Sequence, residues 1–344
     1  MSYQSDINSI LKIAIEKKAS DVHLVPGAPP LLRIYGEILP LNEYGSLNPT
    51  GIRILVKPMV PEEKWAVFEQ AGEVDFPYGV PGLARFRCNM FKQRGSISLA
   101  MRVINSEIKS IEKLGLPEIL KEIVKKRDGL ILVTGPTGSG KSTTLAAMID
   151  LINQERKDVI ITLEDPIEYL HQHKNCIISQ REIGSDTRSF ADGLRSALRS
   201  DPDVIQVGEM RDLETISTAL TAAETGHLVL STLHTRGAAK TIDRIIDAFP
   251  SEQQQQIRIQ LAAVLEAVIY QQLIKRKDGK GMVPAVEVLI GTPAVRNMIR
   301  EGKTHQLNSV IETSVRFGMK TAKMALEELV KRNLIDPYDL HTQI

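Results

Sequence analysis

Cysteine, aromatic residues and a surplus of either charge are all scarce in this sequence. Its 344 residues include two cysteines, Cys88 and Cys176, which excludes a framework of several disulfides and a zinc site built from four cysteines. Aromatic residues make up 4% of the chain, and the formal net charge is +1. A chain so neutral and so poor in aromatic rings lacks the usual features of a nucleic-acid-binding protein, so we expect no nucleic-acid partner.

Long apolar stretches are missing as well. No run of apolar residues reaches the roughly 18 to 20 that a membrane-spanning helix needs. The first residues, MSYQSDINSILKIAIEKK, have the pattern of an amphipathic helix rather than that of a signal peptide. We therefore expect a cytoplasmic protein without a transmembrane segment. Its length predicts two domains, because one domain usually has about 100 to 200 residues.

The first third of the chain predicts a small α+β domain rich in antiparallel strands. Apolar residues recur at helical spacing near its start: Ile7, Ile10, Leu11, Ala14 and Ile15. Short runs separated by glycine and proline, which are typical of strands, come next. These are DVHLVPG, LLRIYGEILPL, EVDFPYGV, LARFRCNMFKQRG and SISLAMRVI. Charge then rises before a Gly-Leu-Pro break, so we place the first domain at residues 1–107 and a linker at 108–118.

The pattern changes in residues 119–344, which predict an α/β domain. Aliphatic runs alternate there with helical stretches: GLILVTG, DVIITLED, DVIQVGE and HLVLSTLH. This alternation predicts a parallel sheet covered by helices, with functional groups at the carboxyl ends of the strands. From Ser251 onward the pattern predicts mainly helix. The clearest apolar face of this last part consists of Leu261, Val264, Leu265, Val268 and Ile269.

A glycine-rich loop lies between the first of these strands and the helix after it. The sequence GPTGSGKS, from Gly135 to Ser142, matches G-x-x-x-x-G-K-[ST] in the strand-loop-helix context that this motif requires. Backbone N–H groups there can surround a phosphate because glycine leaves the approach free, and the following helix adds its positive end. A turn with positive φ would explain one glycine, but not three followed by Lys-Ser.

The motif predicts ATP and Mg²⁺ as the cofactors. Lys141 would reach the β- and γ-phosphates, and the Ser142 hydroxyl would bind the metal ion. The predicted nucleotide-binding residues are Gly135, Pro136, Thr137, Gly138, Ser139, Gly140, Lys141, Ser142 and Thr143.

Two carboxylates turn this binding motif into a candidate catalytic site. Glu164 and Glu209 each follow a predicted strand, at the sheet edge where the glycine loop lies. We assign Glu209 to the metal ion and Glu164 to orienting or deprotonating the attacking water. Gln206 interrupts the apolar run before Glu209, and a glutamate stands where this kind of strand usually has aspartate. The competing interpretation is that each acid caps a helix or pairs with an arginine.

Histidines and arginines complete the list of candidates. His234 follows the next strand at the same edge, so we expect it to contact the γ-phosphate, whereas His227 precedes that strand and is a candidate sensor or structural residue. An arginine supplied by a neighbouring subunit can raise the rate of phosphoryl transfer by about 10³ to 10⁵. The candidates, for which a surface ion pair is the competing interpretation, are Arg85, Arg87, Arg102, Arg195, Arg199 and Arg211.

Together these motifs resemble the ATPases of type II secretion and type IV pilus systems, and within them the pilus retraction ATPases. ITLEDPIEY resembles the Asp box of the family, LRSDPDVIQVGEMRD its atypical Walker B motif and TAAETGHLVLSTLHT its His box. ASDVHLVPGAPPLLRIYGE is similar to the opening of its PAS-like N-terminal domain. AVRNMIRE, from Ala294 to Glu301, resembles the retraction signature AIRNLIRE, with Val295 and Met298 as conservative changes. Without the resemblance, this segment predicts a short amphipathic helix with exposed Arg296 and Arg300.

The resemblance implies a fold and an assembly. The fold is a PAS-like N-terminal domain followed by a RecA-like P-loop domain with a helical C-terminal part. The assembly is a homohexamer that binds each nucleotide between the N-terminal domain of one subunit and the RecA-like domain of its neighbour. Hydrolysis would move the two domains about the flexible connection IEKLGLP.

The resemblance also implies a cellular role. A ring at the pilus base, attached peripherally to the inner membrane through a platform protein, would drive pilin disassembly and twitching motility. A pilus assembly or secretion ATPase of the same family is the first alternative. A nucleic-acid motor, or a nucleotide-gated scaffold without turnover, is the second.

Overall fold

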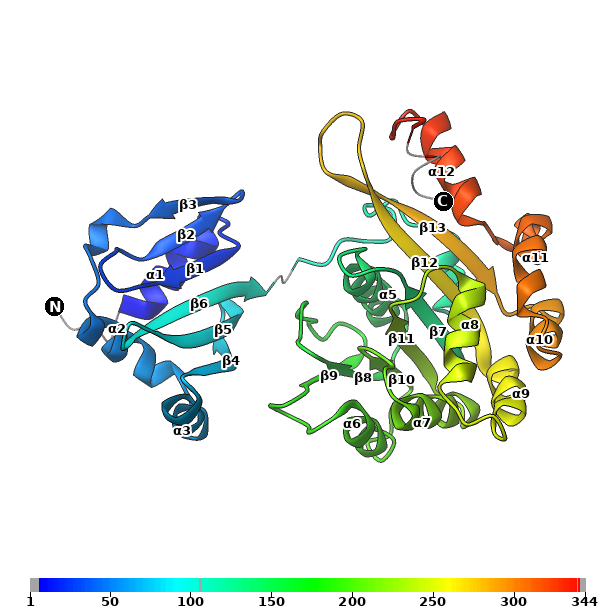
Figure 1. The fold of residues 1–344 in the computed structure, drawn as a ribbon, viewed down its shortest axis with the longest axis horizontal. Helices are drawn as coiled ribbons and strands as arrows, with labels where there is room; N and C mark the ends of the chain where they lie inside the picture. Colours follow the sequence, from blue (N-terminus) through cyan, green and yellow to red (C-terminus); the bar gives the residue numbers. More distant parts are fainter. Residues whose placement is uncertain (1–5, 105–106, 339, 341–344) are drawn as a thin grey trace. The chain divides into compact units, whose positions relative to one another are not determined.

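The computed structural model describes the chain except for residues 1–5, 105–106, 339 and 341–344 (Figure 1). It divides into two compact units: one extends to residue 107 and includes residues 168–170, and the other contains residues 108–167 and those from 171 onward. Each unit has its own β-sheet. Among the described residues, no helix combines the length and the apolar character that crossing a lipid bilayer needs.

The first unit is a six-stranded antiparallel sheet with strand order β3-β2-β1-β6-β5-β4. Its strands and α-helices are α1 (Asp6–Glu16), β1 (Asp21–Leu24), β2 (Leu31–Ile34), β3 (Glu37–Pro40), α2 (Pro49–Val56), α3 (Glu62–Ala71), β4 (Glu73–Val80), β5 (Ala84–Gln93) and β6 (Ser96–Ile104). Alternate residues of the strands, such as Val22, Phe86 and Met101, pack with the helices in one apolar core. The other face of the sheet carries charged side chains.

The sequence prediction for this unit is confirmed for its strands and its first helix. All five short runs contain strands, and LLRIYGEILPL contains two of them. The helices α2 and α3 were not predicted. A local signal for α2 exists, because Asn48 Oδ1 accepts a hydrogen bond from Gly51 N at 2.7 Å and Pro49 opens the helix.

The second unit is a seven-stranded sheet with strand order β13-β12-β7-β11-β10-β8-β9. Its strands are β7 (Gly129–Thr134), β8 (Val159–Glu164), β9 (Ile177–Glu182), β10 (Val204–Val207), β11 (Leu228–Leu233), β12 (Leu265–Lys275) and β13 (Met282–Ile290). Its α-helices are α4 (Ile119–Ile123), α5 (Lys141–Glu155), α6 (Phe190–Ala197), α7 (Leu213–Glu224), α8 (Ala238–Asp247), α9 (Gln254–Val264), α10 (Pro293–Arg300), α11 (Leu307–Thr313) and α12 (Ala322–Lys331). All neighbouring strands are parallel except β12 and β13.

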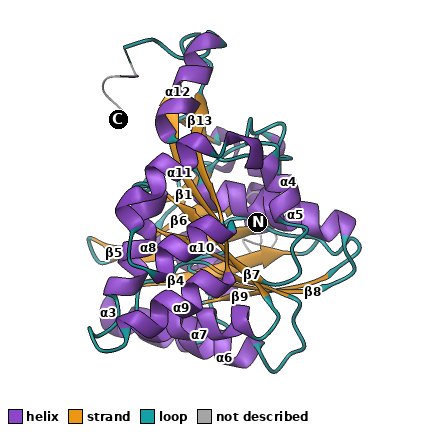
Figure 2. Ribbon diagram, turned by 90° about the vertical axis from the view of Figure 1, so that its right-hand side faces the viewer, coloured by secondary structure: helices purple, strands orange, loops and turns teal. Residues whose placement is uncertain are grey.

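Helices cover both faces of this sheet, which explains why the central strands β7, β10 and β11 are buried along their whole length. In β7, Leu130 and Leu132 pack into the core with α6 to α9, whereas Ile131 and Val133 pack with α4 and α5 on the opposite face. Figure 2 shows this arrangement, with α4 and α5 on one side of β7 and β8 and with α6, α7 and α9 on the other. The predicted fold class, with a parallel sheet covered by helices, is confirmed.

The helical prediction for residues after Ser251 is wrong in one part. Helix α9 ends at Val264, and Leu265 begins the long strand β12, which pairs with β7 and forms an antiparallel hairpin with β13. Val268 and Ile269 therefore face opposite cores and share no helical face. A strand buried on both faces carries apolar residues without alternation, so its pattern imitates that of a buried helix.

Part of the predicted linker is packed. Ile111 and Leu116 are 2% and 6% exposed and belong to the core of the second unit, beside α4 and α5. The expectation that IEKLGLP is a flexible connection is therefore not met at these two side chains, because each is fixed by apolar contacts.

Candidate functional site

The glycine loop has the geometry of a phosphate-binding loop. It connects the buried strand β7 to α5, and Gly140 caps that helix with a left-handed φ of +86°. At the tip of the loop Thr137 and Gly138 are exposed, and Ser142 and Thr143 lie half-buried in the first turn of α5. The amino end of a 15-residue helix, which is the positive end of its dipole, thus faces the loop.

The three glycines of the loop meet different structural requirements. A Cβ at Gly135 would come within 2.2 Å of the main-chain oxygen of Gln271, and a Cβ at Gly140 within 2.8 Å of its Nε2. At Gly138 nothing lies within 4 Å of the Cβ position, and the φ is +78°. Gly138 therefore gives the loop its left-handed turn and an open approach, whereas Gly135 and Gly140 also make room for a neighbouring strand, which the sequence did not indicate.

Lys141 is held by its own loop. Its Nζ donates hydrogen bonds to the carbonyl oxygens of Gly135 and Pro136, both at 2.9 Å, and the residue is 8% exposed. The same Nζ lies 3.4 Å from Nδ1 of His234, which follows β11. The amine is thus buried at the head of the phosphate-binding loop, among acceptors that a phosphate oxygen can replace.

His234 connects Lys141 to Glu209. Its Nε2 lies 3.2 Å from Glu209 Oε1, while Glu209 Oε2 forms an ion pair with Arg211 at 2.7 Å. Because a lysine amine only donates, Nδ1 of His234 must accept, so the proton of a neutral imidazole lies on Nε2 and is donated to Glu209. The structure thus brings together Lys141, His234 and Glu209 at the predicted sheet edge. The arginine pair that competes with a metal-binding role for Glu209 is also present.

Glu164 ends β8 at the same edge and is buried, with 9% exposure. Its Oε1 accepts hydrogen bonds from Thr162 Oγ1 at 2.6 Å and from Gln180 Nε2 at 2.9 Å. Gly208, which precedes Glu209, would place a Cβ only 3.4 Å from the Glu164 Cα. Glu164 is therefore an oriented carboxylate next to the Glu209 loop, as a group that positions water requires.

Thr162 and Gln180 are functional candidates that the sequence analysis missed. Thr162 precedes Glu164 by two residues on the same strand, so the period of a strand could have indicated a contact between their side chains. Gln180 lies on β9, which was not predicted as a strand, and no local signal connects it to Glu164.

The predicted arginines of the second unit are engaged on its surface. Arg195 pairs with Asp192 at 2.7 Å and with Glu214, and it accepts a hydrogen bond from Arg199 through its carbonyl oxygen at 2.9 Å. Arg211 is the partner of Glu209. A role of these arginines at the nucleotide of a neighbouring subunit stays a prediction.

The predicted arginines of the first unit lie on the polar face of its sheet. Arg102 on β6 pairs with Asp21 at 3.0 Å and keeps 73% of its side chain exposed. Arg87 is its cross-strand neighbour on β5, and Arg85 lies two residues away on the same strand. Burial alone would raise the pKa of Asp21, but hydrogen bonds from Ser20 and Arg102 lower it overall. Arg87 and Arg102 are exposed, whereas Arg85 is half-buried.

His227 lies at the other edge of the second sheet. It precedes β11, and its Nδ1 contacts the carbonyl oxygen of Ala222 at 2.9 Å and the Thr225 hydroxyl at 3.2 Å. These contacts close the carboxyl end of α7. They correspond to the structural interpretation of His227, and its role as a sensor stays a prediction.

The segment AVRNMIRE forms α10, with Val295 buried and Met298 packed against the same core. The expectation that Arg296 is exposed is wrong, because its side chain is 21% exposed and donates to Gly291 O at 2.7 Å and Ala262 O at 2.9 Å. It also pairs with Glu266 at 2.5 Å. Arg296 thus satisfies carbonyl groups at the end of α9, where four carbonyls have no partner within the helix. Arg300 is exposed, as expected.

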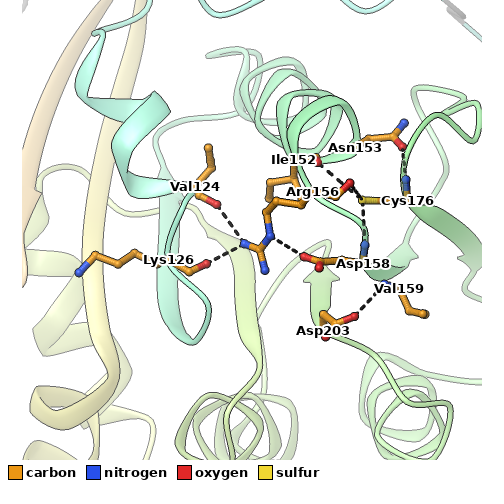
Figure 3. A network of polar contacts seen from close by, with 9 residues as sticks. All are labelled: Val124, Lys126, Ile152, Asn153, Arg156, Asp158, Val159, Cys176 and Asp203. Carbon is orange, nitrogen blue, oxygen red and sulfur yellow. Dashed lines mark hydrogen bonds and ion pairs between the residues drawn. The ribbon is translucent and has the colours of Figure 1, made fainter.

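The carboxyl end of α5 is fixed by a separate polar network (Figure 3). Arg156 NH1 donates to the carbonyl oxygens of Val124 at 3.1 Å and Lys126 at 2.7 Å, and Nε of Arg156 pairs with Asp158. Cys176 Sγ lies 3.2 Å from the Arg156 carbonyl oxygen. This end of the helix is thereby joined to the segment after α4 and to the start of β9.

The fold and this site define a P-loop ATPase. The chain matches the family described as "Type II/IV secretion system protein" over residues 80–329. It is 49% identical, over 96% of its length and 95% of the relative's, to the type IV pilus retraction ATPase PilT of Pseudomonas aeruginosa. It is 46% identical to a twitching motility protein of Neisseria gonorrhoeae, over 96% of this chain and 88% of that protein.

A solved structure agrees with these relatives. The crystal structure of the pilus retraction motor PilT with bound ADP has a TM-score of 0.90 and 51% sequence identity, over 98% of this chain and 96% of that chain. This chain therefore belongs to the type II/IV secretion system protein family and is an ATPase. The resemblance inferred from its motifs is confirmed.

Proposed function

We propose that this chain is the motor ATPase that retracts type IV pili, acting as a homohexamer. The observation that carries the proposal is the contact of His234 with both Lys141 and Glu209 at the sheet edge where the glycine loop lies, in a chain that matches retraction ATPases over nearly its whole length. The segment AVRNMIRE favours retraction over assembly or secretion, because it resembles the retraction signature. The presence of only two cysteines agrees with this, because the resemblance implies a four-cysteine zinc site in assembly ATPases. These features support the proposal together, because each one alone is shared by other ATPases.

The site residues take distinct roles in this proposal. Lys141 exchanges its contacts with the loop carbonyls for oxygens of the β- and γ-phosphates. His234 contacts the γ-phosphate and responds to its presence through its own contacts with Lys141 and Glu209. Glu164 accepts the hydrogen of the attacking water or orients it. Thr162 and Gln180 hold Oε1 of Glu164 by hydrogen bonds and so fix the orientation of its carboxylate.

The described residues fit a magnesium ion that is bound chiefly through its nucleotide. The Ser142 hydroxyl and the Glu209 carboxylate are oxygen donors, which Mg²⁺ prefers. In the described part of the chain, no group of three or more His, Cys, Asp or Glu residues could hold a metal ion together. Phosphate oxygens and water would therefore supply the remaining ligands, and the ion would neutralise charge that develops during transfer.

In the proposed hexamer, arginines reach the nucleotide of a neighbouring subunit. The exposed, cross-strand pair Arg87 and Arg102 supports this, because it offers two neighbouring cations to an anionic ligand. The hexamer would act at the cytoplasmic side of the inner membrane, on a platform protein at the pilus base. Alternating nucleotide states would shift the two units relative to each other and drive pilin removal.

A genetic experiment tests the proposal. Pilus-bearing cells that lack this gene should be hyperpiliated and unable to twitch if the protein retracts pili, whereas they should be bald if it assembles them. Expression of the wild-type chain should restore motility, and expression of Glu164→Gln should not. Bald cells would overturn the retraction proposal, and steady-state ATP hydrolysis that Glu164→Gln leaves unchanged would show that Glu164 does not activate water.

A further inference from the structure

A glutamine from a distant strand lies directly behind the phosphate-binding loop. Gln271 belongs to β12, which pairs with β7 in parallel, and the residue is 3% exposed. Its main-chain oxygen occupies the space beside Gly135, and its side-chain amide occupies the space beside Gly140. Two of the glycines of the motif thus face the same residue.

The side-chain amide of Gln271 makes two hydrogen bonds to the loop and its helix. Nε2 donates to the carbonyl oxygen of Ser139 at 2.7 Å, and Oε1 accepts from Thr144 Oγ1 at 2.6 Å. Thr144 is 1% exposed and lies in the first turn of α5. Gln271 therefore joins the loop to the helix that follows it, from a position 132 residues away in the sequence.

This contact fixes the direction in which the peptide after Ser139 points. A phosphate-binding loop works only if its N–H groups point inward, so that its carbonyl groups must point away and find donors in the protein. The Ser139 carbonyl accepts its hydrogen bond from Gln271 Nε2, whereas no atom lies within 4 Å of the Cβ position at Gly138. Without that donor, a buried carbonyl would lose its partner, and the peptide could turn toward the phosphate.

We infer that Gln271 is a positioning residue of the nucleotide site, which holds the Ser139–Gly140 peptide with its N–H toward the phosphates. The inference rests on the proposed nucleotide site and deepens it. Gln271 acts through the loop and makes no contact with the nucleotide itself. Removal of the Gln271 side chain therefore lowers the affinity for phosphate-bearing nucleotides more than it lowers the rate at which bound ATP is hydrolysed.

The test compares two neighbouring glutamines in the full-length protein. Gln271→Met keeps the length of the side chain and removes both hydrogen bonds. Gln272→Met is the matched control, because Gln272 is also buried, at 8% exposure, and its side chain contacts Tyr270 at 3.4 Å. Binding is measured with a fluorescent ADP analogue and Mg²⁺, turnover is measured with ATP, and the melting temperature shows that each variant is folded.

We expect Gln271→Met to raise the Kd about tenfold and to change kcat by less than about threefold. Gln272→Met should keep the wild-type Kd. An unchanged Kd in Gln271→Met, or an equal loss in both variants, would overturn the inference. If the wild type itself fails to bind the probe, the proposed nucleotide site is wrong, which is a separate result.

A second pair of variants keeps the test decisive if Gln271→Met does not fold. Thr144→Val removes the hydroxyl that donates a hydrogen bond to Gln271 Oε1, whereas Thr144→Ser retains this hydroxyl. We expect Thr144→Val to raise the Kd about threefold and Thr144→Ser to restore it. Wild-type affinity in Thr144→Val, or failure of Thr144→Ser to restore it, would show that this hydrogen-bonded connection does not position the loop.

Discussion

At its amino end, α5 begins with a buried amine whose partners are two loop carbonyls and one exposed histidine. At its carboxyl end, the Arg156 guanidinium binds the backbone of the segment after α4 and the carboxylate of Asp158 (Figure 3). The first set of contacts, two within the phosphate-binding loop and one to the residue after β11, can be exchanged for phosphate oxygens. The second connects the helix to other elements and has no such substitute.

The carboxyl end gains further fixation from neighbouring residues. Asn153 Oδ1 accepts from the backbone N–H groups of Lys174 at 3.1 Å and Cys176 at 3.2 Å. One helix thus has contacts at its amino end that phosphate oxygens can replace, and contacts at its carboxyl end that stay in place.

The largest effect should come from Lys141→Ala. This change removes the charge that binds the phosphates but keeps the apolar contacts of α5, so we expect the affinity for ATP to fall about 10³-fold, near 4 kcal/mol. The melting temperature should change little. Titration with a fluorescent ATP analogue and Mg²⁺ measures the loss. Equal binding by wild type and variant would show that the amino end of α5 does not bind phosphate through Lys141, and so does not differ in function from the carboxyl end.

Glu164→Gln should have the next largest effect, on turnover alone. Glutamine can still accept from Thr162 and Gln180 through its carbonyl oxygen, so the site keeps its shape. It cannot take a proton, so kcat should fall about 10²-fold while nucleotide affinity stays within about twofold. Steady-state hydrolysis and equilibrium binding are measured on the same preparation. The control is Glu168→Gln, a change at an exposed glutamate four residues further along the chain.

The placement of the candidate site residues was largely predictable, because these residues follow a local rule. The motif fixes Gly135 to Ser142 between a strand and a helix, and parallel strands end at one edge, which brings Glu164, Glu209 and His234 near the loop. Each of these residues is recognised from the few positions around it. The order of strands in the sheet is not needed for the argument.

The supporting residues could not be predicted, because they depend on that order. Gln271 reaches the loop only because β12 pairs with β7, and the sequence pattern of β12 imitated a helix. Gln180 reaches Glu164 only because β9 lies beside β8. Arg296 looked like an exposed residue of a short helix, since the carbonyls that it binds belong to the end of another helix.

Arg156→Ala should act on stability rather than on the site. It leaves the Asp158 carboxylate, whose side chain is 11% exposed, without its cation, and it frees two backbone carbonyls. We expect a loss of about 2 to 3 kcal/mol in the free energy of unfolding. Urea unfolding measures it, with Arg244→Ala on the exposed face of α8 as the control.

The affinity of folded Arg156→Ala for nucleotide should stay within about threefold of the wild type. A stable variant with a loss of affinity like that of Lys141→Ala would mean that the two ends of α5 act as one site.

Cys176→Ala should have the smallest effect and should depend on pH. The thiol lies 3.2 Å from the Arg156 carbonyl oxygen, so its removal should cost about 1 kcal/mol near neutral pH. Burial raises the pKa of Cys176 above its ordinary value of 9.0. Above that pH the unfolded chain loses the proton before the folded protein does, so the folded state binds more protons and stability falls as pH rises.

The alanine variant lacks this pH-dependent contribution. The difference in free energy of unfolding between the wild type and the variant should therefore shrink between about pH 8 and about pH 10. Urea unfolding of both proteins across this range measures the change, and the difference between them cancels the titration of other groups. A difference in free energy of unfolding that grows with pH would show that the folded state favours the thiolate. The carboxyl end of α5 would then be an anion-binding environment rather than a network built on a neutral donor.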